Sequence, residues 1–299
     1  MWIDYLIFAA SVLAATGVAV GGNFAGKRLF PAPSDVYRLN VMTNGLGFVL
    51  FAILAIGHPL SLFSIWFGVV FGALILLSGI FNVRAYASGP LHITMLLSTS
   101  SMLIPALSGC LFFGEPFSLP KLLFALAPIG FIFLFLAPGK KDAGEEKKES
   151  RVTGKWLLYV FLNFTASGSL GVLQKVQQTS AYREESNGFL MVAFLFAFLF
   201  ALCMRLRTVP TVPLGRKHFL CGLVIGLSLF VAHAANLYLS GAFPSQLVFP
   251  VVNGLPLIFT TLIAVVFFHE PLNRRQCVGL LGGILSILCI TCSDIWFPV

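Results

Sequence analysis

Ten apolar segments of about 20 residues each dominate this chain and limit what it can fold into. An α-helix of about that length crosses a hydrocarbon core of roughly 30 Å. The segments lie at residues 3–22, 36–56, 62–86, 91–113, 119–137, 155–176, 187–205, 218–239, 244–268 and 275–293. The sequence is 58% hydrophobic and only 10% charged, which excludes a soluble globular domain. The chain is therefore expected to lie in a lipid bilayer.

These segments are expected to be helices rather than strands. They are rich in Leu, Phe, Ala and Gly, and they lack the alternation of polar and apolar residues found in outer-membrane strands. Lipid offers no partner to the backbone, and a helix satisfies its own N–H and C=O groups. The first segment contains Asp4 and is too long for the core of a signal peptide, so we interpret it as a span. The expected fold is an all-α polytopic membrane protein.

One short motif occurs twice, at matching places in the two halves of the chain. Phe112-Phe113-Gly114-Glu115-Pro116 and Phe267-Phe268-His269-Glu270-Pro271 each follow one long apolar segment and precede another. Tyr86-Ala87-Ser88-Gly89 likewise resembles Tyr238-Leu239-Ser240-Gly241. These pairs indicate a tandem duplication.

Each copy holds five segments, and an odd number makes the second copy enter the membrane in the opposite orientation. We therefore expect ten transmembrane helices arranged as two inverted five-helix repeats, residues 1–138 and 155–299. Residues 139–154 are almost free of apolar side chains and mix basic with acidic ones, so they are expected to form a solvated linker.

Basic residues are distributed unevenly over the loops between the segments. The odd-numbered loops carry 16 Lys and Arg, whereas the even-numbered loops carry 3, namely Lys121, Lys175 and Arg183. By the positive-inside rule the odd loops are cytosolic, which places both termini outside. The formal net charge of +8 follows from this topology and gives no reason to expect a nucleic acid as a partner.

The paired motifs resemble the drug/metabolite transporter superfamily, and within it the EamA-like ten-helix transporters. Members close helices four and nine with Gly-Glu or a variant and open the next helix with glycines. The first helix of each repeat tends to read Gly-small-Asn-aromatic and then Lys, a pattern that the second copy here matches in spacing but without the Asn. The residues that carry the resemblance here are Glu115-Pro116-Phe117, Glu270-Pro271-Leu272 with Gly279, Gly282 and Gly283, Gly22-Asn23-Phe24 with Lys27, and Gly168-Ser169-Leu170 with Lys175. The resemblance implies a transporter, and it implies that both termini are cytosolic, in conflict with the charge count.

Polar residues inside the segments are the candidates for a substrate site. They concentrate in segments three, four, eight and nine, at similar levels of the two expected repeats, where transporters of this architecture bind substrate. The candidates are Asn82, Arg84, Tyr86, Ser98, Ser101, His233, Asn236, Tyr238 and Asn253. Each also has a purely structural interpretation, since Ser, Thr and Asn bond to their own or a neighbouring helix. Arg84 could equally extend to the interface or bind a carboxylate or phosphate.

The acids are placed differently. Glu115 and Glu270 precede a proline at the start of a helix, where a carboxylate is stabilised by the helix dipole, so we interpret them as caps. No Asp or Glu lies near the middle of any segment, which argues against an exporter of strong cations. The six cysteines, including the pair Cys289 and Cys292, lack the further ligands of a metal site. No metal or cofactor is expected.

The expected function is transport, by alternating access, of a small neutral, zwitterionic or anionic metabolite, and an amino acid or related compound is the best guess. The alternatives are a carrier of sugars, nucleotide sugars or sugar phosphates and, outside transport, a membrane scaffold or lipid-handling protein. No P-loop is present, so transport would be gradient-driven or facilitative. The partners expected are the substrate and the bilayer, with the protein a monomer or homodimer. A plasma membrane, such as a bacterial inner membrane, is the expected location, and no enzyme activity is expected.

Overall fold

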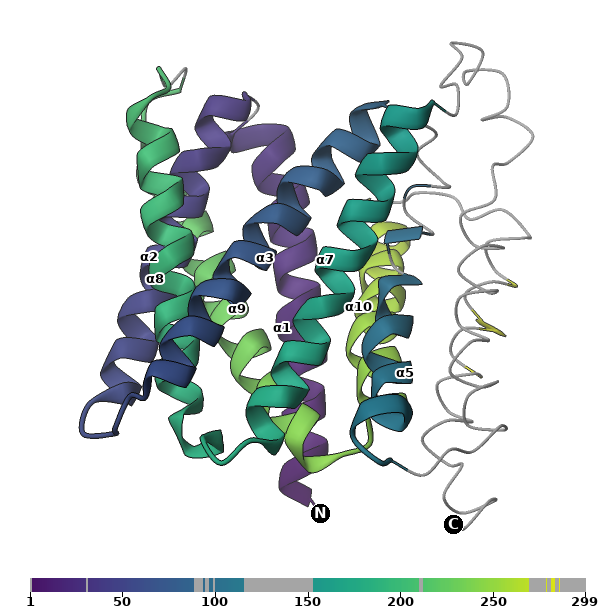
Figure 1. Cartoon of the computed structure of the whole chain (residues 1–299). Coiled ribbons are helices and arrows are strands. Elements are labelled where there is room, and N and C mark those ends of the chain that lie inside the picture. The colour runs from purple at the N-terminus through teal and green to yellow at the C-terminus, as the bar shows by residue number, and fades with distance from the viewer. Residues whose placement is uncertain are drawn as a thin grey trace. The chain divides into compact units, whose positions relative to one another are not determined.

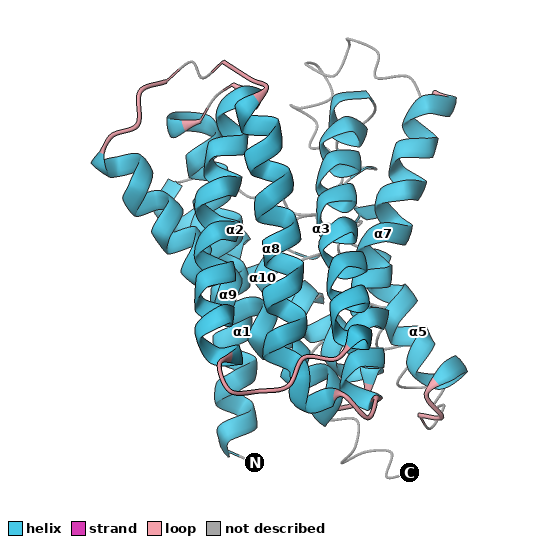
Figure 2. Ribbon diagram, turned by 60° about the vertical axis from the view of Figure 1, so that its left-hand side comes forward, coloured by secondary structure: helices cyan, strands magenta, loops and turns pink. Residues whose placement is uncertain are grey.

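The computed structural model describes residues 2–30, 32–88, 94, 97, 98, 100–115, 153–209, 212–268, 278, 281, 282 and 285. These residues form helices joined by loops, and no strand occurs among them (Figures 1 and 2). Six helices in this part of the chain are long and apolar enough to cross a membrane, and two shorter apolar helices accompany them. The expected all-α membrane architecture is therefore confirmed.

The chain divides into two compact units. Unit 1 comprises Met1–Ala73 and Leu173–Ala242, and unit 2 comprises Leu74–Val172 and Phe243–Val299. Each unit thus combines parts of both halves of the sequence. The compact units and the expected repeats, 1–138 and 155–299, are different divisions of one chain, and most of the linker at 139–154 lies outside the described residues.

Unit 1 contains four whole helices, parts of two more, and two short turns of other helix types. They are α1 (Trp2–Phe24), η1 (Ala25–Leu29), α2 (Pro33–Ala55), η4 (Arg183–Glu185), α8 (Ser186–Leu206) and α9 (Arg216–Ala242), with the beginning of α3 (Leu62–Ser88) and the end of α7 (Gly154–Thr179). Within this unit α2 packs against α8 and α9, and α1 packs along α9. Figure 1 shows α2 and α8 side by side.

Close helix contacts in unit 1 depend on glycine. A Cβ on Gly72 of α3 would lie 2.6 Å from the carbonyl oxygen of Ala193 in α8, and one on Gly68 would lie 2.8 Å from that of Phe189. Gly68 and Gly72 are four residues apart, the small-xxx-small spacing that lets two membrane helices touch backbone to backbone. The sequence of α3 therefore selects α8 as a close neighbour.

Aromatic rings fill the interior of unit 1. Phe51 of α2 lies 5.4 Å from Phe194 of α8 and 4.5 Å from Phe230 of α9, measured between ring centroids. Phe71 of α3 lies 5.0 Å from Phe189 of α8. Tilted contacts at these distances are favourable beyond simple burial.

Among the described residues, unit 2 contains the rest of α3 and α7 together with three further elements. These are η2 (Ser100–Met102), α5 (Leu103–Phe112) and α10 (Ser245–Phe268). The helix α5 packs against α10. Gly168 of α7 leaves room for Ile104, and Gly171 leaves room for Pro105 and Phe249.

Most expected spans agree with the described helices to within a few residues. The expected span 91–113 differs, because a 3₁₀ turn at Ser100–Met102 precedes α5. Pro105 accounts for the change, because in a regular α-helix its ring would clash with the carbonyl of Ser101, four residues earlier, and because it has no N–H to donate. In contrast, α10 runs through both Pro250 and Pro256. The expected span 119–137 and nearly all of 275–293 lie outside the described residues.

Candidate functional site

A hydrogen-bonded network of amides and hydroxyls lies inside unit 2. The Asn163 Nδ2 of α7 donates to Ser98 Oγ at 2.8 Å and to Asn82 Oδ1 of α3 at 3.5 Å. Ser98 Oγ donates to the same Asn82 oxygen at 3.3 Å, and Ser167 Oγ donates to Asn163 Oδ1 at 3.2 Å. Asn163 is only 2% exposed. This polar network joins three separate segments of the chain.

Asn82 keeps unused capacity in this network. Its Oδ1 accepts two hydrogen bonds, but no described residue accepts one from its Nδ2 group, and its side chain is partly exposed. A primary amide has two N–H donors. Asn82 therefore offers donors to a ligand with carbonyl, carboxylate or hydroxyl oxygens.

Aromatic side chains and one cation flank the network. Trp156 is 3% exposed and donates from Nε1 to Thr94 Oγ1 at 2.8 Å. Tyr159 stacks on Phe81 with centroids 6.4 Å apart, and the guanidinium carbon of Arg84 lies 5.8 Å from the Tyr159 ring centroid. A guanidinium over a tyrosine ring is held by a cation–π interaction and still presents its N–H groups to an anion.

Three other expected site residues lie on α9 in unit 1. The ring of His233 meets Phe71 and Phe194 edge to face. Asn236 Oδ1 accepts a hydrogen bond from Ser11 Oγ of α1, and the hydroxyl of Tyr238 donates to Asp4 Oδ1 at 3.1 Å. Asn236 and Tyr238 thus link α9 to α1, and Tyr238 is 43% exposed near the end of the helix.

The remaining expected site residues are in unit 2. Ser101 is buried in the turn η2, and Asn253 Nδ2 donates at 2.8 Å to the carbonyl of Phe249 in its own helix. Tyr86 belongs to α3, but its side chain lies outside the described residues. The structure brings Asn82 and Ser98 together directly, with Arg84 two residues along α3 from Asn82.

Several residues in the network or flanking it were not among the expected site residues. Asn163, Ser167, Trp156 and Tyr159 all come from α7, the first helix of the second half. Their spacing of three to four residues places them along one face of that helix, which is the signal that could have revealed them. The described residues contain no cluster of His, Cys, Asp or Glu able to hold a metal ion.

The comparisons with known proteins identify the second half of the chain. The family model of the EamA-like transporter family matches residues 154–292. These residues form an EamA-like transporter domain. The expected membership of the drug/metabolite transporter superfamily is thereby confirmed. The match also supports the prediction of a multi-pass integral membrane protein of the transporter type.

Two further comparisons bear on the EamA-like chain. A solved protein described as "Crystal structure of protein" has a similar fold, with a TM-score of 0.79 and 14% sequence identity over 100% of both chains. At that identity the likeness shows the fold alone. No curated protein sequence matches the chain. Members of the EamA family are transporters rather than enzymes, and the match leaves their substrate unspecified.

The first Glu-Pro motif of this EamA-like protein performs a capping role. Gly114 has φ +64°, and the Glu115 N–H bonds to the carbonyl of Gly109 at 3.1 Å, which ends α5 and turns the chain. The Glu115 carboxylate accepts from the backbone N–H of Ser245 at 2.8 Å and from its hydroxyl at 3.0 Å. Ser245 is the first residue of α10, so Glu115 caps that helix. Glu270 lies outside the described residues.

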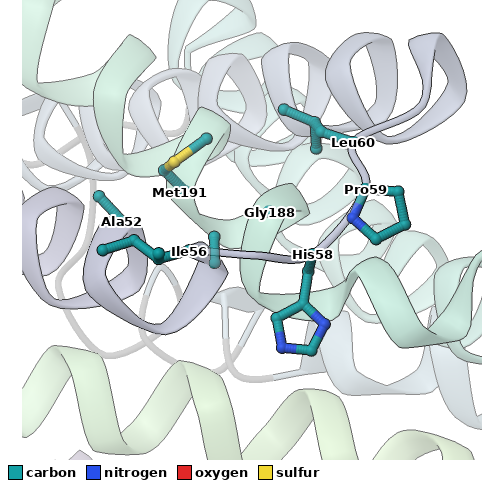
Figure 3. Close-up of a pocket in the computed structure, with 8 residues that line it drawn as sticks. Ala52, Ile56, His58, Pro59, Leu60, Gly188 and Met191 are labelled. Carbon is teal, nitrogen blue, oxygen red and sulfur yellow. The ribbon is translucent and has the colours of Figure 1, made fainter.

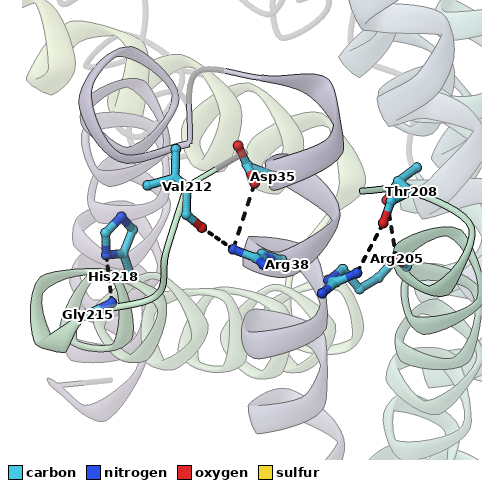
Figure 4. Close-up of polar contacts among 7 residues, drawn as sticks. All are labelled: Asp35, Arg38, Arg205, Thr208, Val212, Gly215 and His218. Carbon is cyan, nitrogen blue, oxygen red and sulfur yellow. Dashed lines mark hydrogen bonds and ion pairs between the residues drawn. The ribbon is translucent and has the colours of Figure 1, made fainter. Parts of the chain in front are cut away.

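Charged residues also fix the loops at both ends of α2 and α8 in unit 1. Arg38 Nη1 donates to the carbonyl of Val212 and lies 3.9 Å from the Asp35 carboxylate (Figure 4). Near it in the same view, Arg205 donates to the carbonyl of Thr208 at 3.1 Å. Elsewhere, the Glu185 carboxylate accepts from the Ser61 N–H at 2.9 Å and from its hydroxyl at 2.6 Å, just before α3. These contacts position helix ends rather than a ligand.

A cavity of about 200 Å³ opens at the α2–α3 loop of unit 1 (Figure 3). His58 is its one ionisable residue, and the others are apolar. It is lined by Ala52, Ala55, Ile56, His58, Pro59, Leu60, Gly188 and Met191. None of the expected site residues borders it, so the polar network of unit 2 remains the better candidate site.

Proposed function

We propose that this chain is a secondary-active or facilitative transporter that moves a small neutral, zwitterionic or anionic metabolite by alternating access. The best candidate is an amino acid or a related compound. The observation that carries the proposal is the network of Asn163, Asn82 and Ser98 inside a membrane protein of the transporter type. Polar groups are expensive within a bilayer and are commonly retained for function.

The chemistry of the network supports this substrate class. The N–H donors of Asn82 have no acceptor among the described residues, and Arg84 carries a positive charge two residues further along α3. A ligand with a carboxylate satisfies both kinds of group. No Asp or Glu occurs in the described part of α3 that belongs to unit 2, or in α7, α5 and α10. A strong cation would find no counter-charge on these helices.

A sugar or sugar derivative is the second candidate. Asn side chains bond hydroxyl groups as well as carboxylates, and Trp156 and Tyr159 provide flat apolar rings beside the network. Sugars use both kinds of contact. Flux separates either carrier from a scaffold or lipid-handling protein, because a scaffold has no reason to move solute.

The test is a thermal-shift screen of the purified, detergent-solubilised protein, followed by uptake into proteoliposomes. The panel contains amino acids, sugars, sugar phosphates, nucleotide sugars, organic anions and quaternary amines. A ligand that binds only the folded state stabilises it by about 2.7 kcal/mol at 100 times its Kd. We expect amino acids to raise the melting temperature and quaternary amines to leave it unchanged.

The variant Asn82→Ala tests the proposed site itself. It removes the N–H donors of Asn82. We expect at least about tenfold more ligand to be needed for the same rise in melting temperature, which corresponds to a loss of roughly 1.4 kcal/mol of binding free energy. Thr165→Ala is the matched control, because the Thr165 hydroxyl bonds only to carbonyls of its own helix. A folded Asn82→Ala protein with unchanged binding and uptake would place the substrate elsewhere.

A further inference from the structure

His233 is an ionisable residue within the span α9, and the proposed site in unit 2 makes no use of it. The centroid of its ring lies 5.9 Å from that of Phe71 and 5.4 Å from that of Phe194, at interplanar angles of 84°. Its Nδ1 atom is enclosed, and no described residue forms a hydrogen bond with it. The residue as a whole is partly exposed. An unpartnered polar atom inside a bilayer is costly and points to a function.

The rings around His233 are held firmly in place. Phe71 is 0% exposed and Phe194 is 1% exposed. Phe194 also contacts Phe51, and it occupies the space left by the missing side chain of Gly47 on α2. These rings cannot easily move away to admit a hydrogen-bond partner for Nδ1. The surroundings therefore suit a neutral imidazole and disfavour a charged one.

No charge on the surrounding helices compensates the imidazole. Residues 62–73 of α3 contain no ionisable side chain. None of the ionisable residues on the remaining α-helices of unit 1, or elsewhere on α9, forms a hydrogen bond or ion pair with His233. They are Asp4 and Tyr5 on α1, Asp35, Tyr37 and Arg38 on α2, Lys175 on α7, Cys203 and Arg205 on α8, and Arg216, Lys217, His218, Cys221 and Tyr238 on α9.

We propose that His233 carries the proton in a proton-coupled transport cycle, an inference that rests on the proposed function. One proton from one compartment binds to Nε2 and converts the neutral imidazole to imidazolium. The charged ring favours an arrangement of α9 in which it leaves its phenylalanine neighbours. The same proton dissociates into the other compartment before the neutral ring returns. Protonation and conformation are thus linked through one side chain.

A packing role alone does not explain the residue. A leucine or phenylalanine in the same place would fill the space between Phe71 and Phe194 without leaving a nitrogen unpartnered. Histidine adds the ability to take up and release a proton near neutral pH. The unpartnered Nδ1 raises the free energy of this conformation. A switch between two protonation states requires such a cost, because it lets a change in protonation favour the other conformation.

The experiment uses proteoliposomes of wild-type protein and of His233→Gln, with a ¹⁴C-labelled mixture of the twenty L-amino acids as the probe. Glutamine keeps a polar side chain but cannot carry a proton. His58→Gln is the matched control, since His58 lies exposed in the α2–α3 loop. Counterflow exchange is measured first at equal pH on both sides. Accumulation is then measured with a difference of one pH unit in each direction.

We expect wild-type protein and His58→Gln to accumulate label in one direction of the gradient, up to about tenfold for one proton per substrate. We expect His233→Gln to retain counterflow and to lose accumulation. If wild-type protein shows counterflow but accumulates no label under either pH gradient, the coupling alone is overturned. The same conclusion follows if His233→Gln accumulates label like wild type. Absence of counterflow in the wild type overturns both the proposed function and the coupling.

A second measurement covers the case in which His233→Gln does not fold. Wild-type proteoliposomes containing the pH indicator pyranine receive the unlabelled amino-acid mixture on the outside. Proton coupling predicts a change in internal pH when the mixture is added, and none in liposomes without protein. A constant internal pH during measured uptake contradicts the proposal without any variant.

Discussion

Both carboxylate oxygens of Glu115 accept hydrogen bonds from Ser245. One oxygen accepts from the backbone N–H and the other from the hydroxyl. The donor N–H is one of the first in α10, where the helix leaves its amides without intrahelical partners. Glu115 therefore contributes to stability through hydrogen bonds and through the dipole of α10, and it does not need a substrate to explain its presence.

Replacing Glu115 by Gln tests this role. Glutamine has one acceptor oxygen where the carboxylate uses two, and it has no negative charge at the helix start. We expect the free energy of unfolding to fall by about 1 to 2 kcal/mol, measured as a lower melting temperature in detergent. The control is Glu184→Gln, whose side chain is exposed in η4. Loss of ligand binding in a stable Glu115→Gln protein contradicts a capping role.

At the scale of residues, the sequence predicts the type of side chain at the site better than its identity. Asn82, Ser98 and Arg84 were expected, and the structure joins the first two in one network. The main partner, Asn163, was missed although its spacing along α7 can be seen in the sequence, because an asparagine that bonds between helices looks the same in sequence as one that faces a cavity.

At the scale of elements, the contact between α3 and α8 is set by the absence of side chains. A Cβ at Gly72 would lie 2.6 Å from the carbonyl oxygen of Ala193 and 3.2 Å from its Cα. These are backbone atoms of a neighbouring helix, so no side-chain rotation relieves the clash. One helix must move away from the other if the glycine is replaced.

Gly72→Ala is expected to lower the free energy of unfolding by about 1 to 3 kcal/mol, because it forces α3 and α8 apart. Gly79→Ala is the matched change in the same helix: no described atom lies within 4 Å of its Cβ position. Alanine is the better helix former by roughly 1 kcal/mol, so Gly79→Ala should keep or raise stability. Equal melting temperatures of the two variants contradict the importance of this contact.

Helix positions were predicted well because apolar length is a strong signal in a membrane protein. The expected spans 62–86 and 218–239 correspond to α3 (Leu62–Ser88) and α9 (Arg216–Ala242). Effects of proline were harder to predict. Pro105 accompanies a change to 3₁₀ geometry, whereas Pro250 and Pro256 lie in an unbroken helix. Whether neighbours compensate a lost N–H depends on packing, which a single sequence does not display.

At the scale of the whole molecule, the two ends of unit 1 differ in charge. The end where α2 begins, α8 ends and α9 begins carries Arg38, Arg205, Arg207, Arg216 and Lys217. The other end of α2 leads into the loop that contains His58. Since basic residues mark the cytosolic side, unit 1 predicts that the loop before α9 is cytosolic and the α2–α3 loop is external.

Single cysteines test this orientation. In a background with all six native cysteines replaced, His58→Cys should react with a membrane-impermeant maleimide on intact cells. Leu214→Cys, at a site 51% exposed next to the basic end, should react only after the membrane is permeabilised. The opposite pattern supports the orientation that the family resemblance implies, with both termini in the cytosol.

Two helices do not belong to a single unit. The boundary of the units falls after Ala73 within α3 and after Val172 within α7, and both helices continue through it without interruption. Gly72 and Gly171 each lie one residue before the last residue that precedes the boundary. Each of these two helices therefore contributes one part of its length to the packing of each unit, so neither unit is built from a continuous stretch of the sequence.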